Sequence, residues 1–146
     1  MSTISAIICT YNREKYIGKA LESIRNQSLD KDRIQIVIVD NNSTDSTERI
    51  CQDFIKANPG LSINYVVEKE QGLSAARNRG IRESSSDYLT FVDDDARLDP
   101  QFLEVTCTYL DSNPGVEAVG GKILLDYEFR PPACSIYVLP VPDLPA

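Results

Sequence analysis

The chain has 146 residues, 42% of them hydrophobic, a formal net charge of −7 and no histidine. This length and apolar content suit one compact domain. With 22 acidic against 15 basic residues and no basic block, nucleic acid is not an expected partner. The lack of histidine excludes a Ser-His-Asp triad, a Cys-His pair and a histidine-ligated zinc site. Any metal is therefore expected to be held by oxygen ligands, which favours Mg²⁺ or Mn²⁺.

Apolar segments alternate with amphipathic ones along the first half of the chain. Residues 4–9 form a short, nearly continuous apolar run, typical of a strand buried on both faces. Apolar residues then recur with helical spacing between positions 17 and 24. A β-branched run at 34–39 predicts a second strand. Asp45 with Glu48 resembles a capping box that opens a second helix.

The second half of the chain repeats this alternation. Runs at 61–68 and 88–92 predict the third and fourth strands, and a helix is expected between them from about residue 72 to 83. Asp99-Pro100 predicts a further helix start, with the aspartate as N-cap and the proline at the first helical position. Residues 116–125 predict a fifth strand.

This order of elements predicts an α/β fold, a three-layer sandwich in which helices flank a mainly parallel sheet. Ligands of such sheets bind outside the carboxyl ends of the strands. The domain is expected to span residues 1–125. Residues 126–146 hold five of the eight prolines and predict an extended tail that leads toward a region the chain lacks.

The cysteines are few and dispersed. Cys9, Cys51, Cys107 and Cys134 form no C-x-x-C pair, so a disulfide framework is not expected and reduced thiols in the cytoplasm fit better. The sequence has no N-terminal signal pattern and no apolar run near the ~20 residues of a membrane span. We therefore expect a cytoplasmic protein.

An acidic run, Asp93-Asp94-Asp95, follows the fourth predicted strand. Adjacent carboxylates repel one another unless a cation or hydrogen bonds offset the repulsion. Because alternate side chains of an extended segment point to one side, we expect Asp93 and Asp95 to face one pocket and Asp94 to point elsewhere. Hard divalent cations prefer carboxylates and keep positions open for phosphate oxygens. The competing interpretation is a solvated acidic turn, which is common where strands end.

Two other segments carry polar groups beside the predicted strand ends. Asp40 follows the second strand, where its carboxylate can accept hydrogen bonds from a base or ribose. It can equally form a turn by capping nearby backbone amides. Arg77 and Arg79 lie on a helix rich in small residues, and arginine suits forked contact with phosphate. They can also be surface arginines paired with nearby acids.

Four motifs occur in order along the chain. They are Cys9-Thr10-Tyr11-Asn12-Arg13, Val39-Asp40-Asn41-Asn42-Ser43-Thr44-Asp45, Gly72-Leu73-Ser74-Ala75-Ala76-Arg77-Asn78-Arg79-Gly80 and Val92-Asp93-Asp94-Asp95-Ala96. Together they resemble glycosyltransferase family 2, inverting enzymes with the Rossmann-like GT-A fold. The resemblance covers about residues 4–125. It implies a domain that binds a nucleotide-diphosphate sugar, most commonly a UDP-sugar.

The resemblance also implies roles for individual residues. Asp40 matches the carboxylate that hydrogen-bonds the base, and Arg77 an arginine near the base or diphosphate. Asp93 and Asp95 match the ends of the D-x-D motif, and Gly121 belongs to a glycine pair near the donor sugar. The implied nucleotide-sugar-binding residues are Thr10, Tyr11, Asn12, Arg13, Asp40, Arg77, Asp93, Asp94 and Gly121, and the implied ligands of Mg²⁺ or Mn²⁺ are Asp95 and Asp93.

The family's general base, an acidic residue downstream of the glycine pair, has no match here. After Gly121 the chain offers Asp126, Glu128 and Asp143, none in that motif. We therefore expect a truncated form of an enzyme that transfers sugar to a carbohydrate or lipid-linked acceptor. The alternative is a non-catalytic module that binds nucleotide sugar and metal. Peripheral contact of the full-length protein with the inner face of the membrane, and a homodimer, are left open.

A dehydrogenase-like nucleotide domain is a weaker alternative. It needs a glycine-rich turn directly after the first strand. No glycine follows that strand here until Gly18.

Overall fold

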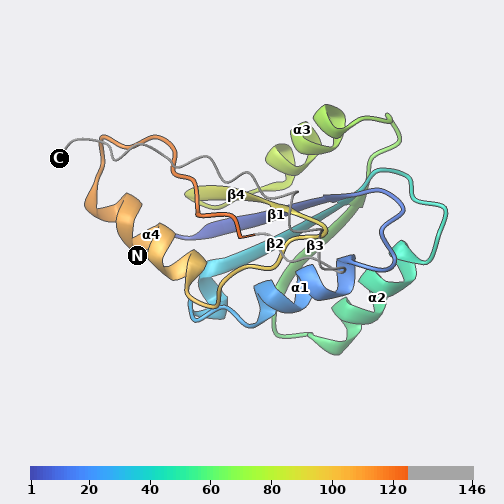
Figure 1. Cartoon of the computed structure of the whole chain (residues 1–146), viewed down its shortest axis with the longest axis horizontal. Coiled ribbons are helices and arrows are strands. Elements are labelled where there is room, and N and C mark those ends of the chain that lie inside the picture. Colours follow the sequence, from blue (N-terminus) through green and yellow to red (C-terminus); the bar gives the residue numbers. More distant parts are fainter. Residues whose placement is uncertain (125–146) are drawn as a thin grey trace, which may run out of the picture.

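A computed structural model describes residues 1–124 and contains a parallel sheet with the strand order β3-β2-β1-β4 (Figure 1). The strands are β1 (Ile4–Thr10), β2 (Ile34–Asp40), β3 (Ser62–Val67) and β4 (Tyr88–Asp93). The helices are α1 (Ile17–Arg25), the short 3-10 helix η1 (Lys31–Arg33), α2 (Thr47–Ala57), α3 (Leu73–Glu83) and α4 (Phe102–Ser112). The α/β sandwich predicted from the alternation is confirmed.

The two central strands are buried on both faces because each face is covered by helices. In β1, Ile4, Ala6 and Ile8 point into a core that also contains buried side chains of α1, α2 and α4. Ile7 lies on the opposite face and packs with Ala76 of α3. Figure 1 shows α1 and α2 on one side of the sheet and α3 on the other, which gives the expected three layers.

Helix α3 approaches the sheet so closely that one of its positions must lack a side chain. A Cβ atom added to Gly80 would lie 2.4 Å from Cγ2 of Ile7 and 3.4 Å from Cγ2 of Val39. A contact of 2.4 Å is shorter than any that real Cβ atoms make, and Ile7 is fully buried and has no space to move. The glycine therefore sets the distance between α3 and β1, and with it the position of α3 on the sheet.

Gly80→Ala is expected to lower the free energy of unfolding by about 1–2 kcal/mol. Overpacking a core costs about 1–3 kcal/mol, and the better helix propensity of alanine returns roughly 1 kcal/mol at most. Urea denaturation measures the change. Gly18→Ala in α1 is the matched control, because its added Cβ would lie 3.8 Å from Cγ2 of Ile50, an ordinary contact. The control is expected to retain or raise stability, and an equal loss in both variants would contradict the close-packing account.

Residues 116–124 contain no strand, so the fifth strand predicted at 116–125 is wrong for the part of it that the structure describes. Ile123 and Leu124 are largely exposed there. A strand needs a neighbour with which to exchange backbone hydrogen bonds, and the glycines at 120 and 121 bring no side chains to pack. An apolar run alone cannot reveal whether that neighbour is present. The predicted tail, 126–146, lies outside the described residues.

Two other predictions concern membrane-spanning segments and the cysteine thiols. Within residues 1–124, no helix is long and apolar enough to cross a bilayer. Cys9, Cys51 and Cys107 are free thiols, and the last two are buried. Burial raises the pKa of Cys51 to about 12, so this thiol stays protonated at neutral pH. Cys134 lies outside the described residues.

Candidate functional site

The carboxyl ends of the central strands bring the polar motifs together at one edge of the sheet. In the strand register, Thr10 is opposite Asp40, and Cys9 is opposite Asp93. The first turn of α3 lies at the same edge, and a pocket of about 470 Å³ opens there. The pocket is lined by Cys9, Thr10, Tyr11, Arg13, Asn41, Gln71, Gly72, Leu73, Ala76, Asp93, Asp94 and Asp95.

The pocket contains part of the predicted site and leaves out the rest. The predicted residues that line it are Thr10, Tyr11, Arg13, Asp93, Asp94 and Asp95. The predicted residues that the structure places outside the lining are Asn12, Asp40, Arg77 and Gly121. The buried hydroxyl of Thr10 lies beside Asp94 and lowers the pKa of that carboxyl, but it forms no hydrogen bond of regular geometry among the described residues. Because buried hydroxyls are normally paired, it can turn to a ligand.

The three aspartates of the acidic run differ in exposure, and the chain turns within the run. Strand β4 ends at Asp93, and the chain turns at once, with the amide of Ala96 donating to the carbonyl of Asp93 at 3.0 Å. All three residues line the pocket, so the expectation that Asp94 lies elsewhere is wrong. Asp93 and Asp95 are exposed, whereas Asp94 is buried. Asp94 is thus separated from Asp93 and Asp95 in exposure, as the alternation predicted, although the backbone is no longer extended beyond Asp93.

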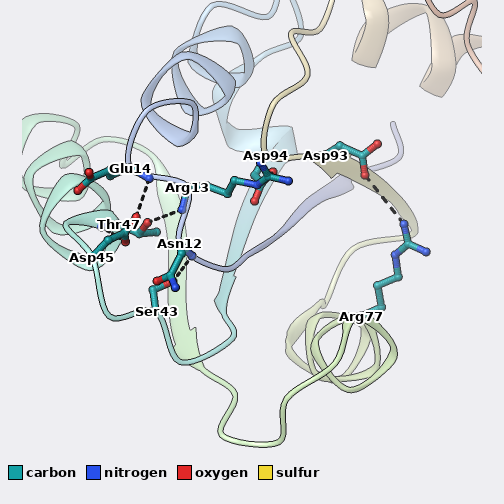
Figure 2. Close-up of polar contacts among 9 residues, drawn as sticks. All are labelled: Asn12, Arg13, Glu14, Ser43, Asp45, Thr47, Arg77, Asp93 and Asp94. Carbon is teal, nitrogen blue, oxygen red and sulfur yellow. Dashed lines mark hydrogen bonds and ion pairs between the residues drawn. The ribbon is translucent and has the colours of Figure 1, made fainter.

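Asp94 is held by a basic partner. Its Oδ1 lies 3.4 Å from Nε of Arg13, and Figure 2 shows the two side chains pointing toward each other. Burial raises the pKa of Asp94, and the charges of Asp95 and Asp93 add to the rise, while the neighbouring hydroxyl of Thr10 and the charge of Arg13 oppose it. Arg13 therefore stabilises a carboxylate that its surroundings disfavour. A second anionic group in the pocket would compete with Asp94 for this guanidinium.

The acidic edge fits a divalent cation only together with a ligand. Across the described residues, no three or more histidine, cysteine or acidic side chains are grouped so as to hold a metal ion. Among these residues Asp93 pairs with Arg77 at 4.0 Å and Asp94 with Arg13, whereas Asp95 forms no ion pair. Mg²⁺ and Mn²⁺ accept one or two protein carboxylates and complete their shell with phosphate oxygens and water. The donor set therefore suits a cation that arrives with a phosphorylated ligand, with Asp95 as the free carboxylate.

The loops after β1 and β2 are joined to each other by hydrogen bonds (Figure 2). The amide of Asn12 donates to Oγ of Ser43 at 3.0 Å, and Oδ1 of Asn12 accepts from the amide of Thr44 at 2.8 Å. Next to it, the amide of Arg13 donates to Oγ1 of Thr47 at 2.9 Å. Asn12 takes a left-handed φ of 53°, which asparagine tolerates. Asn12 thus fixes the loop that presents Arg13 and does not line the pocket itself.

The capping box predicted from Asp45 and Glu48 is not formed. Oδ1 of Asp45 accepts the amide of Thr47 at 2.9 Å, but its Oδ2 accepts the amide of Glu14, from the other loop, at 3.1 Å. The carboxylate of Glu14 in turn accepts the amide of Ser46 at 3.0 Å. A long-range pair has taken the place of the local one. Sequence spacing suggested the local partner because the proximity of residues 14 and 45 depends on the fold.

Asp40 is buried and its carboxylate is committed to the fold. Oδ1 accepts the amide of Ser43 at 2.7 Å, and Oδ2 accepts the hydroxyl of Tyr65 at 2.7 Å. Burial and then the contact with Asp40 raise the pKa of Tyr65, so this hydroxyl stays protonated and donates. The contact with Ser43 is the one that the turn interpretation of Asp40 predicts.

Arg77 and Gly121 do not line the pocket, and each contacts an aromatic side chain. The Arg77 guanidinium covers the ring of Phe91 at 5.3 Å from its centroid and points toward Asp93 (Figure 2). Arg77 therefore does not line the pocket itself, but it pairs with Asp93, which does. A Cβ atom added to Gly121 would lie 2.7 Å from Cε2 of Phe102, so this glycine packs against the start of α4.

The geometry places a nucleotide-sized pocket, three carboxylates and an arginine at the carboxyl edge of a parallel sheet. A family model described as "Glycosyl transferase family 2" matches residues 5–128 of the chain. The chain belongs to glycosyl transferase family 2. The resemblance seen in the four motifs is thereby confirmed, as is the expected fold of this family.

Curated relatives of this chain are longer than it. Glycosyltransferase AglE of Haloferax volcanii is 36% identical over 124 residues, which cover 85% of this chain and 40% of AglE. The GalNAc(5)-diNAcBac-PP-undecaprenol beta-1,3-glucosyltransferase of Campylobacter jejuni is 31% identical over 128 residues, covering 88% and 40% respectively. The chain thus spans about two fifths of the length of these relatives.

Solved structures of glycosyltransferases share the fold. Staphylococcus aureus TarS, solved with UDP, has a TM-score of 0.70 and 28% identity, over 77% of this chain and 33% of the TarS chain. The mannosyltransferase PcManGT of Pyrobaculum calidifontis, solved with GDP-Man and Mn²⁺, has a TM-score of 0.72 and 27% identity, over 75% and 32%. These similarities support the α/β fold described above.

Several lining residues were not predicted as site residues. Asn41 follows β2 directly and lies inside the second motif, while Gly72, Leu73 and Ala76 belong to the third. Their membership of these motifs was the available signal. Gln71 precedes the third motif and carries no signal of its own. Cys9 also lines the pocket, and because burial raises the pKa of its thiol to about 11, it stays protonated at neutral pH and does not supply a thiolate nucleophile.

Proposed function

We propose that the pocket is the donor site of an inverting glycosyltransferase that uses a nucleotide-diphosphate sugar, with a UDP-sugar as the favoured donor. The observation that carries the proposal is the meeting of Asp93-Asp94-Asp95 with Arg13 in one pocket. TarS, solved with UDP and with UDP-GlcNAc, supports a uridine donor. PcManGT, solved with GDP-Man and Mn²⁺, supports the need for a divalent cation.

In this proposal, different lining residues contact different parts of the donor. Tyr11 is half exposed and offers a ring face to the base. The Thr10 hydroxyl, which lies beside Asp94, would turn to bond the nucleoside. The Arg13 guanidinium would leave Asp94 and bind a diphosphate oxygen. Asp95, with Asp93 beside it, would hold the cation. A bound cation supplies positive charge that neutralises the departing nucleoside diphosphate.

Sugar transfer itself is proposed only for a protein as long as these relatives, of whose length this chain spans about two fifths. Asp126, Glu128 and Asp143 lie outside the described residues, and no general base is assigned. The proposed acceptor is a carbohydrate or a lipid-linked sugar, the latter in line with the printed name of the Campylobacter relative. Cytoplasmic location, contact with the inner face of a membrane and a homodimer remain predictions. A non-catalytic nucleotide-sugar and metal module is the second candidate, and it predicts binding with no transfer even when the chain is extended.

Titration calorimetry of UDP with and without Mn²⁺ tests the proposal. We expect binding in the presence of Mn²⁺ and an affinity at least about tenfold lower in EDTA, because the diphosphate then meets uncompensated carboxylates. UMP is the matched control ligand, since it lacks the second phosphate and should lose most of the metal dependence. The same UDP affinity with Mn²⁺ and with EDTA would contradict the proposed site.

A further inference from the structure

Asn41 binds three backbone groups of one segment with its side chain alone. Nδ2 donates to the carbonyl of Glu68 at 3.0 Å and to the carbonyl of Glu70 at 2.7 Å. Oδ1 accepts the amide of Gly72 at 2.9 Å. The residue is 5% exposed, so these bonds form in a site from which water is largely excluded. Both N–H groups of the amide and its oxygen are engaged.

The backbone of Asn41 joins the same segment to the central strands. Its amide donates to the carbonyl of Thr10 at 2.8 Å, and its carbonyl accepts a hydrogen bond from Nε2 of Gln71. Just before it, the carbonyl of Asp40 accepts the amide of Glu68 at 2.8 Å. Asn41 therefore lies between the β1 edge and residues 68–72.

Residues 68–72 form one wall of the pocket. The segment leads from β3 to α3 and supplies Gln71 and Gly72 to the lining. Gly72 has a φ of 140°, a conformation that other residues adopt only with strain, and its carbonyl accepts the amide of Ala76 in the first turn of α3. Holding the Gly72 amide thus fixes both the wall and the start of the helix behind it.

We propose that Asn41 is a positioning residue that keeps the 68–72 wall in the conformation that receives the donor nucleotide. This proposal rests on the proposed function of the pocket. Asn41 has no free N–H to offer a base, so it acts through Gln71 and Gly72, which line the pocket beside it. A wall that is ordered before binding lowers the entropy lost when the ligand is bound.

The side-chain amide is required because the segment presents both donors and acceptors. An aspartate at position 41 has the same shape but no N–H group, so its carboxylate would face the carbonyl oxygens of Glu68 and Glu70. It would also bring a third negative charge close to two acidic residues. Asn41→Asp thus changes the clamp without changing its size.

The test compares Asn41→Asp with Asn42→Asp, its exposed neighbour, which makes the same chemical change outside the clamp. In Asn41→Asp, hydrogen exchange is expected to show lost protection of the Gly72 amide, while amides of β1 and β2 stay protected. UDP and CDP, whose pyrimidine edges differ, are both expected to bind about tenfold more weakly. Their affinity ratio should match that of the wild type. Asn42→Asp should leave protection and affinity unchanged.

A changed UDP/CDP ratio with unchanged exchange at Gly72 would overturn the proposal, because Asn41 would then contact the base directly. Similar losses in both variants would also overturn it. If Asn41→Asp fails to fold, Gly72→Ala strains the same wall from its other end and must give the same pattern, or the proposal fails. Absence of nucleotide binding by the wild-type chain would refute the proposed function, while the exchange measurement, which needs no ligand, would still decide the clamp.

Discussion

Asp95→Asn is expected to abolish metal-dependent binding of UDP, with a loss of about 100-fold or more in affinity, or roughly 2.7 kcal/mol. The substitution retains the shape of the side chain and removes its charge. Asp95 lines the pocket, is exposed, and among the described residues forms no ion pair, so its carboxylate is available to a cation. Loss of that charge removes the protein's principal hold on the metal. Calorimetric titration of UDP at fixed Mn²⁺ measures the loss.

Asp94→Asn is the matched control for this prediction. Asp94 is buried against Arg13, and neutralising it frees the guanidinium to meet the diphosphate. The expected change in UDP affinity is therefore small, about threefold or less in either direction. Equal losses from Asp94→Asn and Asp95→Asn would contradict the assignment of the cation to Asp95.

Asp40→Ala is expected to lower the free energy of unfolding by about 2–4 kcal/mol, because two donors lose their acceptor inside the fold. These donors are the amide of Ser43 and the hydroxyl of Tyr65, each 2.7 Å from the carboxylate. The folded fraction of the variant is expected to bind UDP within about threefold of the wild type, since Asp40 does not line the pocket. Urea denaturation gives the stability, and titration at low temperature gives the affinity.

Tyr65→Phe separates the contributions of the two hydrogen bonds that Asp40 accepts. It removes one hydrogen bond and retains the turn with Ser43, so we expect a smaller destabilisation, about 1–2 kcal/mol. If Asp40→Ala instead had normal stability and bound UDP at least tenfold more weakly, the structural role would be contradicted. Asp40 would then have the role in base binding that the family resemblance implies.

The sheet could be predicted because its central strands carry their signal locally. Residues 4–10 and 34–40 are apolar on both sides, which only a strand between two layers of helices requires. The helices follow from the same alternation, and α3 begins and ends within a residue of its expected limits, 72–83. The fifth strand could not be predicted in this way, because a strand at residues 116–124 depends on a neighbour and not on its own composition.

The place of the site was predictable, but the direction of its side chains was not. Parallel strands bring the ends of β1, β2 and β4 to one edge, so the motifs at residues 10, 40 and 93 had to meet there. Whether Asp40 or Asn41 faces the pocket depends on how the chain turns after β2. The clamp by Asn41 on residues 68–72 joins segments about thirty positions apart, and no spacing rule reveals it.

The central claim is that a nucleoside diphosphate and a divalent cation bind together at the edge formed by β1 and β4. Mn²⁺ broadens the NMR signals of nearby amides, so spectra with UDP and Mn²⁺, compared with UDP and Mg²⁺, locate the metal directly. We expect selective broadening of Tyr11, Gly72 and Asp95. Ile34 and Ser62 lie at the amino ends of β2 and β3, the opposite end of the sheet, and their signals are expected to stay sharp. Broadening centred on that opposite end, or none at the three pocket residues, would contradict the assignment of the donor site.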